Sequence, residues 1–481
     1  MNPIFLPIRW LALLTVAGFS SGNLPSTVAS TRKAPDAVEA MVANDNRAPA
    51  GVLKDGVLTL SLVIRPGALH SEEDASPSVS ALAFAETGKP LSVPGPLIRV
   101  AQGTQVVIRV TNPFKDSLLT VHGLNDHDGK PEVPLKIPAG ESRQLRFTVT
   151  RPGTFFYWAT TGNRELADLQ WFESALNGAF VVDATGAPTN DRIFVLGVWN
   201  RDADSTLTKP RGPQTVMTIN GKAWPYTEKF TYTQGDTARW RWVNPTVDSH
   251  PMHLHGFYYH IESTGTWEKG TQFSGDQRPQ VVTNLMLPGA TMRMWWVPER
   301  PGNWIFHCHF SFHTSAVLAL PRDDEHPMEA MPGMPASTTM PKGGPPHKMS
   351  GLVLGISVLP RAKHTVALSS TTVRNIRLVA QQKAKRFGKF IGMGYVTQDG
   401  PVEPKSDSVL IPGPMLVLKR GQPVKITVVN HLPEPTAVHW HGIELESFPD
   451  GVPGWSGSPG RIMPPIAPKD SFIAEFVPPR A

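Results

Sequence analysis

The chain has 481 residues, a net charge of +6 and a pI near 9.3. This length exceeds what one hydrophobic core supports, and at roughly 150 residues per domain it indicates about three domains. The densest basic stretch, "QQKAKRFGKF" (381–390), has too few charges to indicate a nucleic-acid surface and is better explained as a solvated strand or loop. With 48 prolines, 41 glycines and few helix-periodic stretches, the sequence favours an all-β fold of short strands joined by turns.

Residues 1–30 have the pattern of a signal peptide for export to the periplasm or the exterior. Arg9 precedes the apolar run "WLALLTVAGF" (10–19), and "TVAS" (27–30) offers small residues to a signal peptidase. The run is shorter than the roughly 18 residues that span a bilayer, and no later segment reaches that length. A buried N-terminal helix is the alternative. Export favours disulfides, yet a single cysteine, Cys308, cannot form one within the chain.

A strand-rich unit occurs three times. Alternating apolar residues with a shared G-x8-N spacing recur in "PGPLIRVAQGTQVVIRVTNP" (94–113), "INGKAWPYTEKFTYTQGDTARWRWVNP" (219–245) and "PGPMLVLKRGQPVKITVVNHLP" (412–433). A second shared element follows in each unit, at 137–158, 287–309 and 466–481. The repeats predict three β-sandwich domains, which we place at residues 51–185, 186–322 and 352–481.

The segment between the second and third units, residues 323–351, has the Pro, Gly and Ser content of a flexible linker. It also holds five of the fifteen methionines, at positions 328, 331, 334, 340 and 349. Thioether clusters bind Cu(I), so a role in copper loading is the alternative to a simple tether.

Half of the sixteen histidines fall in three short motifs at equivalent places in the repeats. These motifs are "HPMHLHG" (250–256), "HCHFSFH" (307–313) and "HWHG" (439–442). A lone buried histidine is usually a hydrogen-bonded core residue, but eight at repeat-equivalent positions indicate metal binding.

Strand geometry explains why the cysteine stands between two histidines. Successive side chains on a strand point to opposite faces, so His307 and His309 face one way and Cys308 the other. A metal ion on the thiolate would then be joined covalently to metal ions on the imidazoles. A thiolate with two imidazoles, here from His250 and His313, suits blue copper. Zinc is the competing metal, but structural zinc usually takes four ligands that often include paired cysteines.

These motifs resemble the copper-binding signatures of the multicopper oxidases, laccase-like enzymes built from Greek-key cupredoxin domains, and the resemblance covers nearly the whole mature chain. It implies a type 1 copper on His250, Cys308 and His313, with Leu318 at the axial position, where leucine cannot ligate. It implies a type 2 copper on His253 and His439. It also implies a type 3 copper pair bound by His255, His307, His309 and His441.

The sequence departs from the family pattern in three ways. The "HWHG" unit comes last here, so the two halves of the cluster could meet within one chain or between subunits of a homo-oligomer. The first unit keeps only His122 at its "HWHG" position, with His127 nearby, and has no ligand in "YWATTG" (157–162), so we expect no copper there. A last H-x-H pair is expected about six residues beyond Ala481, which leaves six of eight cluster histidines and an incomplete third domain.

A carboxylate beside the cluster would relay protons for dioxygen reduction. Asp450, in "SFPDGVPG", matches the acidic residue that follows "HWHG" in the family, and a plain Asp-Gly turn is the alternative. The other common relay position carries Ser311. Glu444 and Glu446 are candidate substitutes, although the simpler interpretation makes them surface charges.

Three functions follow from these assignments. The first is an exported oxidase that takes single electrons at type 1 copper from phenols, aromatic amines or metal ions and reduces dioxygen to water through Cys308. The second is an electron-transfer protein with type 1 copper alone, since two type 3 histidines are missing. The third, a copper nitrite reductase, is disfavoured because that enzyme has no use for the doubled histidines around Cys308.

Overall fold

The computed structural model describes residues 39–72, 78–201, 214–315, 349–361, 372–388 and 390–479. The predicted signal peptide, nearly all of the predicted linker and Leu318 lie outside these ranges. In the described part the regular structure consists of strands and one-turn 3-10 helices, which confirms the all-β prediction. None of the helices in these ranges has the length and apolarity that crossing a membrane requires.

The first sandwich consists of two sheets. One is a seven-stranded sheet, ordered β10-β7-β3-β1-β5 with β2 and β4 also paired to β3. Its strands are β1 (Glu39–Ala43), β2 (Val52–Lys54), β3 (Val57–Leu69), β4 (Val79–Glu86), β5 (Ser92–Val93), β7 (Gln105–Thr111) and β10 (Ser142–Thr148). The other is a five-stranded sheet made of β6 (Ile98–Ala101), β12 (Asn177–Asp183), β11 (Gly153–Thr161), β8 (Leu119–His122) and β9 (Leu135–Ile137). The short helices η1 (Leu166–Asp168) and η2 (Trp171–Glu173) follow β11.

Strand β3 shows why these residues form a sandwich. Its side chains alternate between exposed or half-buried and buried, so Leu58, Leu60 and Leu62 all enter the core between the sheets. Strand β11 is buried on both faces because its outer face packs against Trp267 of the second sandwich. The apolar residues of β11 are therefore consecutive rather than alternating.

The second sandwich has two seven-stranded sheets. The first contains β14 (Gln214–Ile219), β13 (Arg192–Arg201), β16 (Ala238–Val243), β22 (Thr291–Trp296), β18 (Tyr259–Gly265), β19 (Gly270–Gln272) and β20 (Gln280–Val281). The second contains β15 (Lys229–Thr233), β24 (Val353–Leu359), β23 (Gly302–Cys308), β17 (His250–Leu254), β21 (Thr283–Met286), β28 (Gly457–Ser458) and β29 (Arg461–Ile462). Two 3-10 helices belong here, η3 (Gly275–Gln277) and η4 (Ser311–His313).

Within the described residues, the third unit forms one four-stranded sheet from β26 (Phe390–Thr397), β25 (Arg374–Phe387), β27 (Val424–Asn430) and β30 (Ser471–Phe476). The 3-10 helix η6 (Phe448–Asp450) lies in the loops that follow β27. A small core that includes Val428 and Trp440 packs against the sheet.

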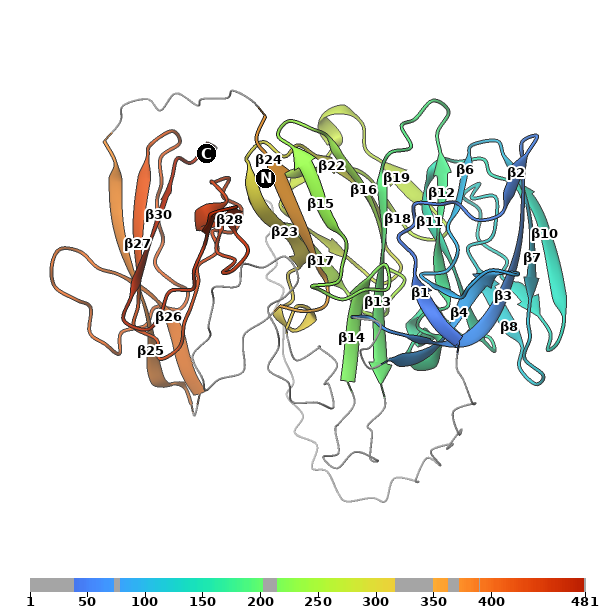
Figure 1. Ribbon diagram of the computed structural model, residues 1–481, viewed down its shortest axis with the longest axis horizontal. Coiled ribbons are helices and arrows are strands. Elements are labelled where there is room, and N and C mark those ends of the chain that lie inside the picture. Colours follow the sequence, from blue (N-terminus) through green and yellow to red (C-terminus); the bar gives the residue numbers. More distant parts are fainter. Residues whose placement is uncertain are drawn as a thin grey trace, which may run out of the picture. The chain divides into compact units, whose positions relative to one another are not determined.

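Two predicted domain boundaries need correction. Strand β24 was assigned to a third domain starting at residue 352, but it pairs with β23 and β15 (Figure 1), so it completes a sheet of the second sandwich. Strand β1 lies before the predicted start of the first domain at residue 51, yet it pairs with β3 and so belongs to that domain. In both cases the partner strand, which is distant in sequence, decides the domain.

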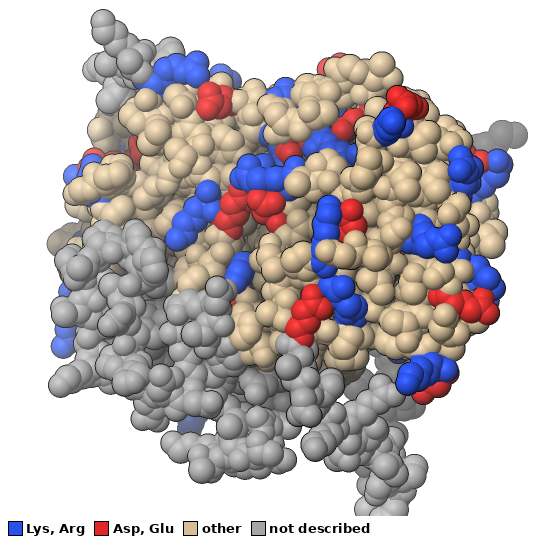
Figure 2. Space-filling model, turned by 45° about the vertical axis from the view of Figure 1, so that its right-hand side comes forward, with Lys and Arg blue, Asp and Glu red and all other residues tan. Residues whose placement is uncertain are grey.

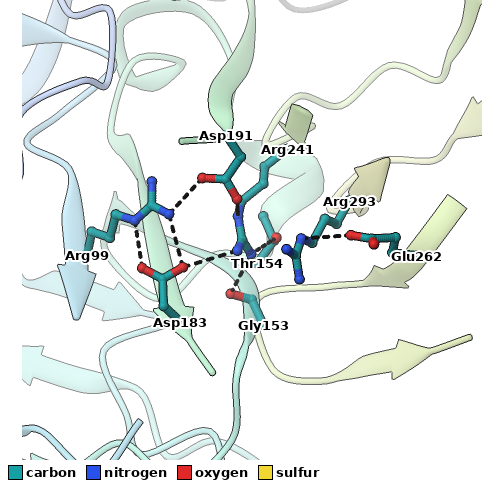
Figure 3. Close-up of polar contacts among 8 residues, drawn as sticks. All are labelled: Arg99, Gly153, Thr154, Asp183, Asp191, Arg241, Glu262 and Arg293. Atoms are coloured by element: carbon teal, nitrogen blue, oxygen red, sulfur yellow. Dashed lines mark hydrogen bonds and ion pairs between the residues drawn. The ribbon is translucent and has the colours of Figure 1, made fainter. Parts of the chain in front are cut away.

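A buried ionic network joins the first two sandwiches (Figure 3). The guanidinium of Arg241, on β16, donates to Asp191 and lies 3.2 Å from an Asp183 oxygen, and Arg99 pairs with both carboxylates. Arg241 is 2% exposed. Buried charges are tolerated only when they are paired and hydrogen-bonded, so this network fixes the contact between the sandwiches. On the face shown in Figure 2, acidic and basic side chains are interspersed rather than gathered into a field of one sign.

Candidate metal centre

Strand β23 presents the cysteine and the histidine beside it to different surroundings. Trp304, Phe306 and Cys308 point into the core of the second sandwich. Ile305 points the other way and packs against Trp455 of the third unit. The alternation predicted from the "HCH" motif is therefore present, and it divides the site into a thiol side and a histidine side.

On the thiol side, three buried donors converge. The Nδ1 atoms of His250 and His313 lie 3.1 Å apart, and the Cys308 Sγ lies 3.8 Å from the first and 3.3 Å from the second. The centre of a triangle with these sides is about 2 Å from each corner, close to the bond lengths that imidazole and thiolate give to first-row metal ions. Two imidazoles and a thiolate in one plane are the donor set of a blue-copper site. We call these three residues the thiol trio.

The fold supplies each member of the trio. His250 opens β17, whose pairing with β23 sets Met252 opposite Cys308. His313 ends η4, where the rings of Phe310 and Phe312 pack edge-on against its imidazole. The strand pairing and the ring contacts therefore place the members of the trio beside one another.

Burial sets the protonation of the trio. Burial, reinforced by the nearby His313, lowers the pKa of His250 to about 3. It also raises the pKa of the Cys308 thiol to about 12. The imidazoles are therefore neutral and ready to ligate, whereas the thiol loses its proton only when a cation takes its place.

On the histidine side, the structure brings together the six predicted cluster histidines from β17, from the end of β23 and from the third unit. The Nε2 atoms of His255 and His307 lie 3.0 Å apart, and those of His253 and His439 lie 3.2 Å apart. The rings of His309 and His441 lie at the exposed edge of the group, with centroids 4.8 Å apart. We call these six residues the histidine cluster.

Hydrogen bonds on the outer ring nitrogens orient four members of the cluster. Each Nδ1 lies against an oxygen acceptor: the carbonyl of Val282 for His253 (2.8 Å), the Asp450 carboxylate for His255 (2.8 Å), the carbonyl of Cys308 for His307 (2.8 Å) and the carbonyl of Asp450 for His439 (2.7 Å). The Nδ1 atoms therefore carry the hydrogens, and the Nε2 lone pairs face one another. Lone pairs directed at a shared space repel unless a cation lies between them, which is the arrangement of a metal site with its outer hydrogen bonds in place.

The pKa values agree with neutral imidazoles. Burial, reinforced by neighbouring histidines, lowers the pKa of His253 and of His307 well below the usual value. Burial lowers the pKa of the more exposed His441 to about 4. These three imidazoles are therefore uncharged at neutral pH and can accept metal ions.

Asp450 is fully buried beneath the cluster. Burial alone would raise the pKa of its carboxyl, but the interactions with His255 and His439 outweigh burial and leave the pKa below its usual range. The residue therefore acts as an anionic acceptor that orients His255. The predicted Asp-Gly turn is present as well, since Gly451 follows with φ 100°.

The other candidate acid–base residues lie in three different environments. The prediction of surface charge is wrong for Glu444, which is 6% exposed and lies 3.7 Å from Arg300 of the second sandwich. Glu446 is exposed. Ser311 lies on the thiol side, in the wall of a pocket over His313.

In the first sandwich, aromatic rings occupy the place of the cluster. Trp158 pairs with His122 across β11 and β8, in the register that joins His307 to His253 in the second sandwich. The ring of His122 stacks on Trp158 at 3.9 Å. His127 stacks on Phe155, burial lowers its pKa to about 3, and neither ring nitrogen has a hydrogen-bond partner.

The pocket on the thiol side gives access to His313. It measures about 760 Å³, and its wall includes Asp248, Phe312 and His313 from the second sandwich and Gln170 from the first. His250 is fully buried, and its Nε2 lies 3.0 Å from the Thr246 hydroxyl. His313 is therefore the member of the trio that a molecule in this pocket would approach. Thr246 and Gln170 carried no sequence signal. Thr246 is a single threonine outside the recognised motifs, and Gln170 reaches the pocket from another sandwich.

The fold and the two groups of donors define the class: a copper protein built from cupredoxin-like domains. Two models described as multicopper oxidase match the chain, one at residues 198–325 and one at residues 90–186 and 409–478, together more than half of its length. The chain belongs to the multicopper oxidase family.

Among curated relatives, the chain is similar to the multicopper oxidase MmcO of Mycobacterium tuberculosis, with 24% identity over 45% of this chain and 46% of that protein. It is also similar to laccase-1 of Botryotinia fuckeliana, with 27% identity over 26% of this chain and 24% of that protein. The chain thus spans less than half the length of these relatives. Among solved structures, it is similar to a blue copper oxidase from Nitrosomonas europaea, with a TM-score of 0.44 and 20% identity over 62% of this chain and 85% of that one.

Proposed function

We propose that the chain is an exported, copper-dependent oxidase that takes single electrons from a small reductant at the thiol trio and delivers them to dioxygen at the histidine cluster. The observation that carries the proposal is the strand that joins the two sides. Cys308 contributes its sulfur to the trio, and the next residue back, His307, contributes its imidazole to the cluster. A continuous covalent path through a single peptide bond therefore connects the two groups of donors.

Bound copper would supply the one-electron redox chemistry and the binding of dioxygen. The protein's own residues would do the rest. Cys308, His250 and His313 would hold one ion in a buried, nearly trigonal set that fits either oxidation state. The histidine cluster would hold further ions at the boundary with the third unit, and Asp450 would keep His255 oriented.

The reductant would approach through the pocket over His313. We propose phenols, aromatic amines or metal ions as the reductant. The pocket wall combines an aromatic ring, Phe312, with a carboxylate, Asp248, so it offers contacts both to flat organic molecules and to hydrogen-bond donors or cations.

Oxygen uptake by the copper-loaded full chain tests this function. One dioxygen accepts four electrons and four protons to give two water molecules, so an oxidase consumes one dioxygen for every four molecules of a one-electron phenol or of ferrous ion. Cys308→Ser should abolish uptake with every reductant. Absence of uptake by a wild-type chain that carries copper on both sides would overturn the proposal.

A second candidate is an electron-transfer protein that uses the trio alone. It is favoured by the exposure of His309 and His441, the two cluster members at the open edge of the described site. Such a protein would take up one tightly bound copper, show a visible charge-transfer band and be reduced reversibly without consuming oxygen.

A further inference from the structure

A chain of buried hydrogen bonds leads from Asn244 through Thr246 to His250. The Thr246 Oγ1 lies 2.7 Å from Asn244 Oδ1 and 3.0 Å from His250 Nε2. The three side chains are at most 6% exposed. Hydrogen bonds in such surroundings are strong, and an unpaired partner is costly.

The hydrogens in this chain can be assigned from its chemistry. The Asn244 Nδ2 donates to backbone carbonyls of Asp248, Met286 and Leu287, at 2.9, 3.2 and 2.9 Å, so its Oδ1 is the acceptor that faces Thr246. The Thr246 hydroxyl has one hydrogen, and the oxygens within its reach are Asn244 Oδ1 and, at 3.3 Å, the Asp248 carbonyl. Neither oxygen can donate, and two oxygens 2.7 Å apart repel each other unless a hydrogen lies between them, so the hydroxyl hydrogen points at Asn244 Oδ1. The hydroxyl oxygen accepts from the Asp248 N–H at 3.2 Å and has a second lone pair with which to accept from His250.

It follows that His250 carries its hydrogen on Nε2. Its Nδ1 lone pair is then directed at the Cys308 sulfur and at His313. Rotation of the ring or transfer of the hydrogen to Nδ1 would break the bond to Thr246.

The three repeats provide an internal comparison. Each has an asparagine at the end of a strand (β7, β16 and β27), and in each the backbone N–H two residues later donates to the asparagine Oδ1. The residue at that second position is Phe114 in the first unit, Thr246 in the second and Leu432 in the third. The loop therefore needs no hydroxyl for its own fold. A hydroxyl stands there in the one unit that contains the trio.

We propose that Thr246 is a positioning residue that fixes the tautomer and the ring orientation of His250 for copper in the thiol trio. The inference rests on the proposed function, because it assumes that the trio binds copper. An acceptor on the outer nitrogen makes an imidazole a better donor to the metal, and loss of such a partner typically reduces metal affinity about 10-fold to 100-fold. A better donor favours Cu(II) over Cu(I), so loss of the acceptor should also raise the reduction potential.

The test compares the copper-reconstituted full chain with Thr246→Val, which keeps the shape, and Thr246→Ser, which keeps the hydroxyl. Thr218→Val is the matched control, because Thr218 is a fully buried threonine of the same sandwich whose hydroxyl has no partner. The measurements are copper affinity by competition with a chelator, the visible charge-transfer band, the reduction potential and the thermal unfolding of the metal-free proteins.

We expect Thr246→Val to lose about 10-fold or more in copper affinity at the trio, to shift the visible band and to raise the potential, while Thr246→Ser and Thr218→Val stay near wild type. If Thr246→Val has the wild-type affinity, band and potential, or if Thr218→Val shows the same changes, the role of Thr246 is overturned while the proposed function stands. A wild-type chain without a visible band would overturn both.

Discussion

Asp450→Asn tests how the histidine cluster is held. The Asp450 carboxylate is fully buried, accepts from His255 Nδ1 at 2.8 Å, lies 3.5 Å from His439 Nδ1 and receives the Ser456 hydroxyl at 3.3 Å. Asparagine keeps one oxygen for His255. Its amide group, however, would then lie beside a second donor on His439, and the negative charge would be gone.

The expected effect is on metal affinity. Replacing an outer partner of a metal-binding histidine typically costs about 10-fold to 100-fold in affinity, which corresponds to about 1.4 to 2.8 kcal/mol. The loss should be confined to the site of His253, His255 and His439. The thiol trio should keep its affinity, because Asp450 contacts none of its members.

Chelator competition on the copper-loaded full chain measures both sites at once, with the visible band of the trio as an internal reference. Ser456→Ala is the matched control, and its longer contact predicts a smaller loss. The reasoning is refuted if Asp450→Asn binds copper at the cluster as tightly as wild type. It is also refuted if the variant loses the visible band in parallel, since the carboxylate would then support the whole fold rather than the cluster.

Two further predictions concern stability. Arg241→Met leaves Asp191 buried with one guanidinium fewer, so the free energy of unfolding measured in urea should fall by about 3–5 kcal/mol. The control is Arg293→Met, at the half-buried pair with Glu262, which should lower the free energy of unfolding by under about 1 kcal/mol. Equal losses in the two variants would contradict the role of the network. Burial lowers the pKa of His127 to about 3 in the folded chain, while the unfolded chain takes up that proton near pH 6.5. Stability should therefore fall as the pH drops, and between pH 7 and pH 5 His127 should account for about 2 kcal/mol of that loss; a His127→Phe variant with an unchanged pH dependence would contradict this.

The sequence predicted the division of the site well, because that division depends on local geometry. Alternation along one strand is enough to separate Cys308 from its flanking histidines. The repeats were visible because each unit must bury alternating apolar residues, as β3 and β27 do. Both signals lie within a few residues of the features they predict.

The features that the sequence did not predict depend on contacts between residues that are far apart in the chain. "VLGISVL" (353–359) indicates a strand, yet its sheet is decided by β23, some fifty residues earlier. The sequence suggested that Glu444 is a surface charge, because its contact with Arg300 of another sandwich is not visible in the local sequence. The stacking of Trp158 on His122 likewise needed the register between β11 and β8.

The central claim is that Cys308, with His250 and His313, binds copper through sulfur. The most direct measurement is the visible and electron paramagnetic resonance spectrum of the full chain reconstituted with Cu(II), beside Cys308→Ser. We predict an intense thiolate-to-copper band and a narrow copper hyperfine splitting in the wild type, both lost in the variant. A colourless wild type, or a variant that keeps the band, would contradict the claim.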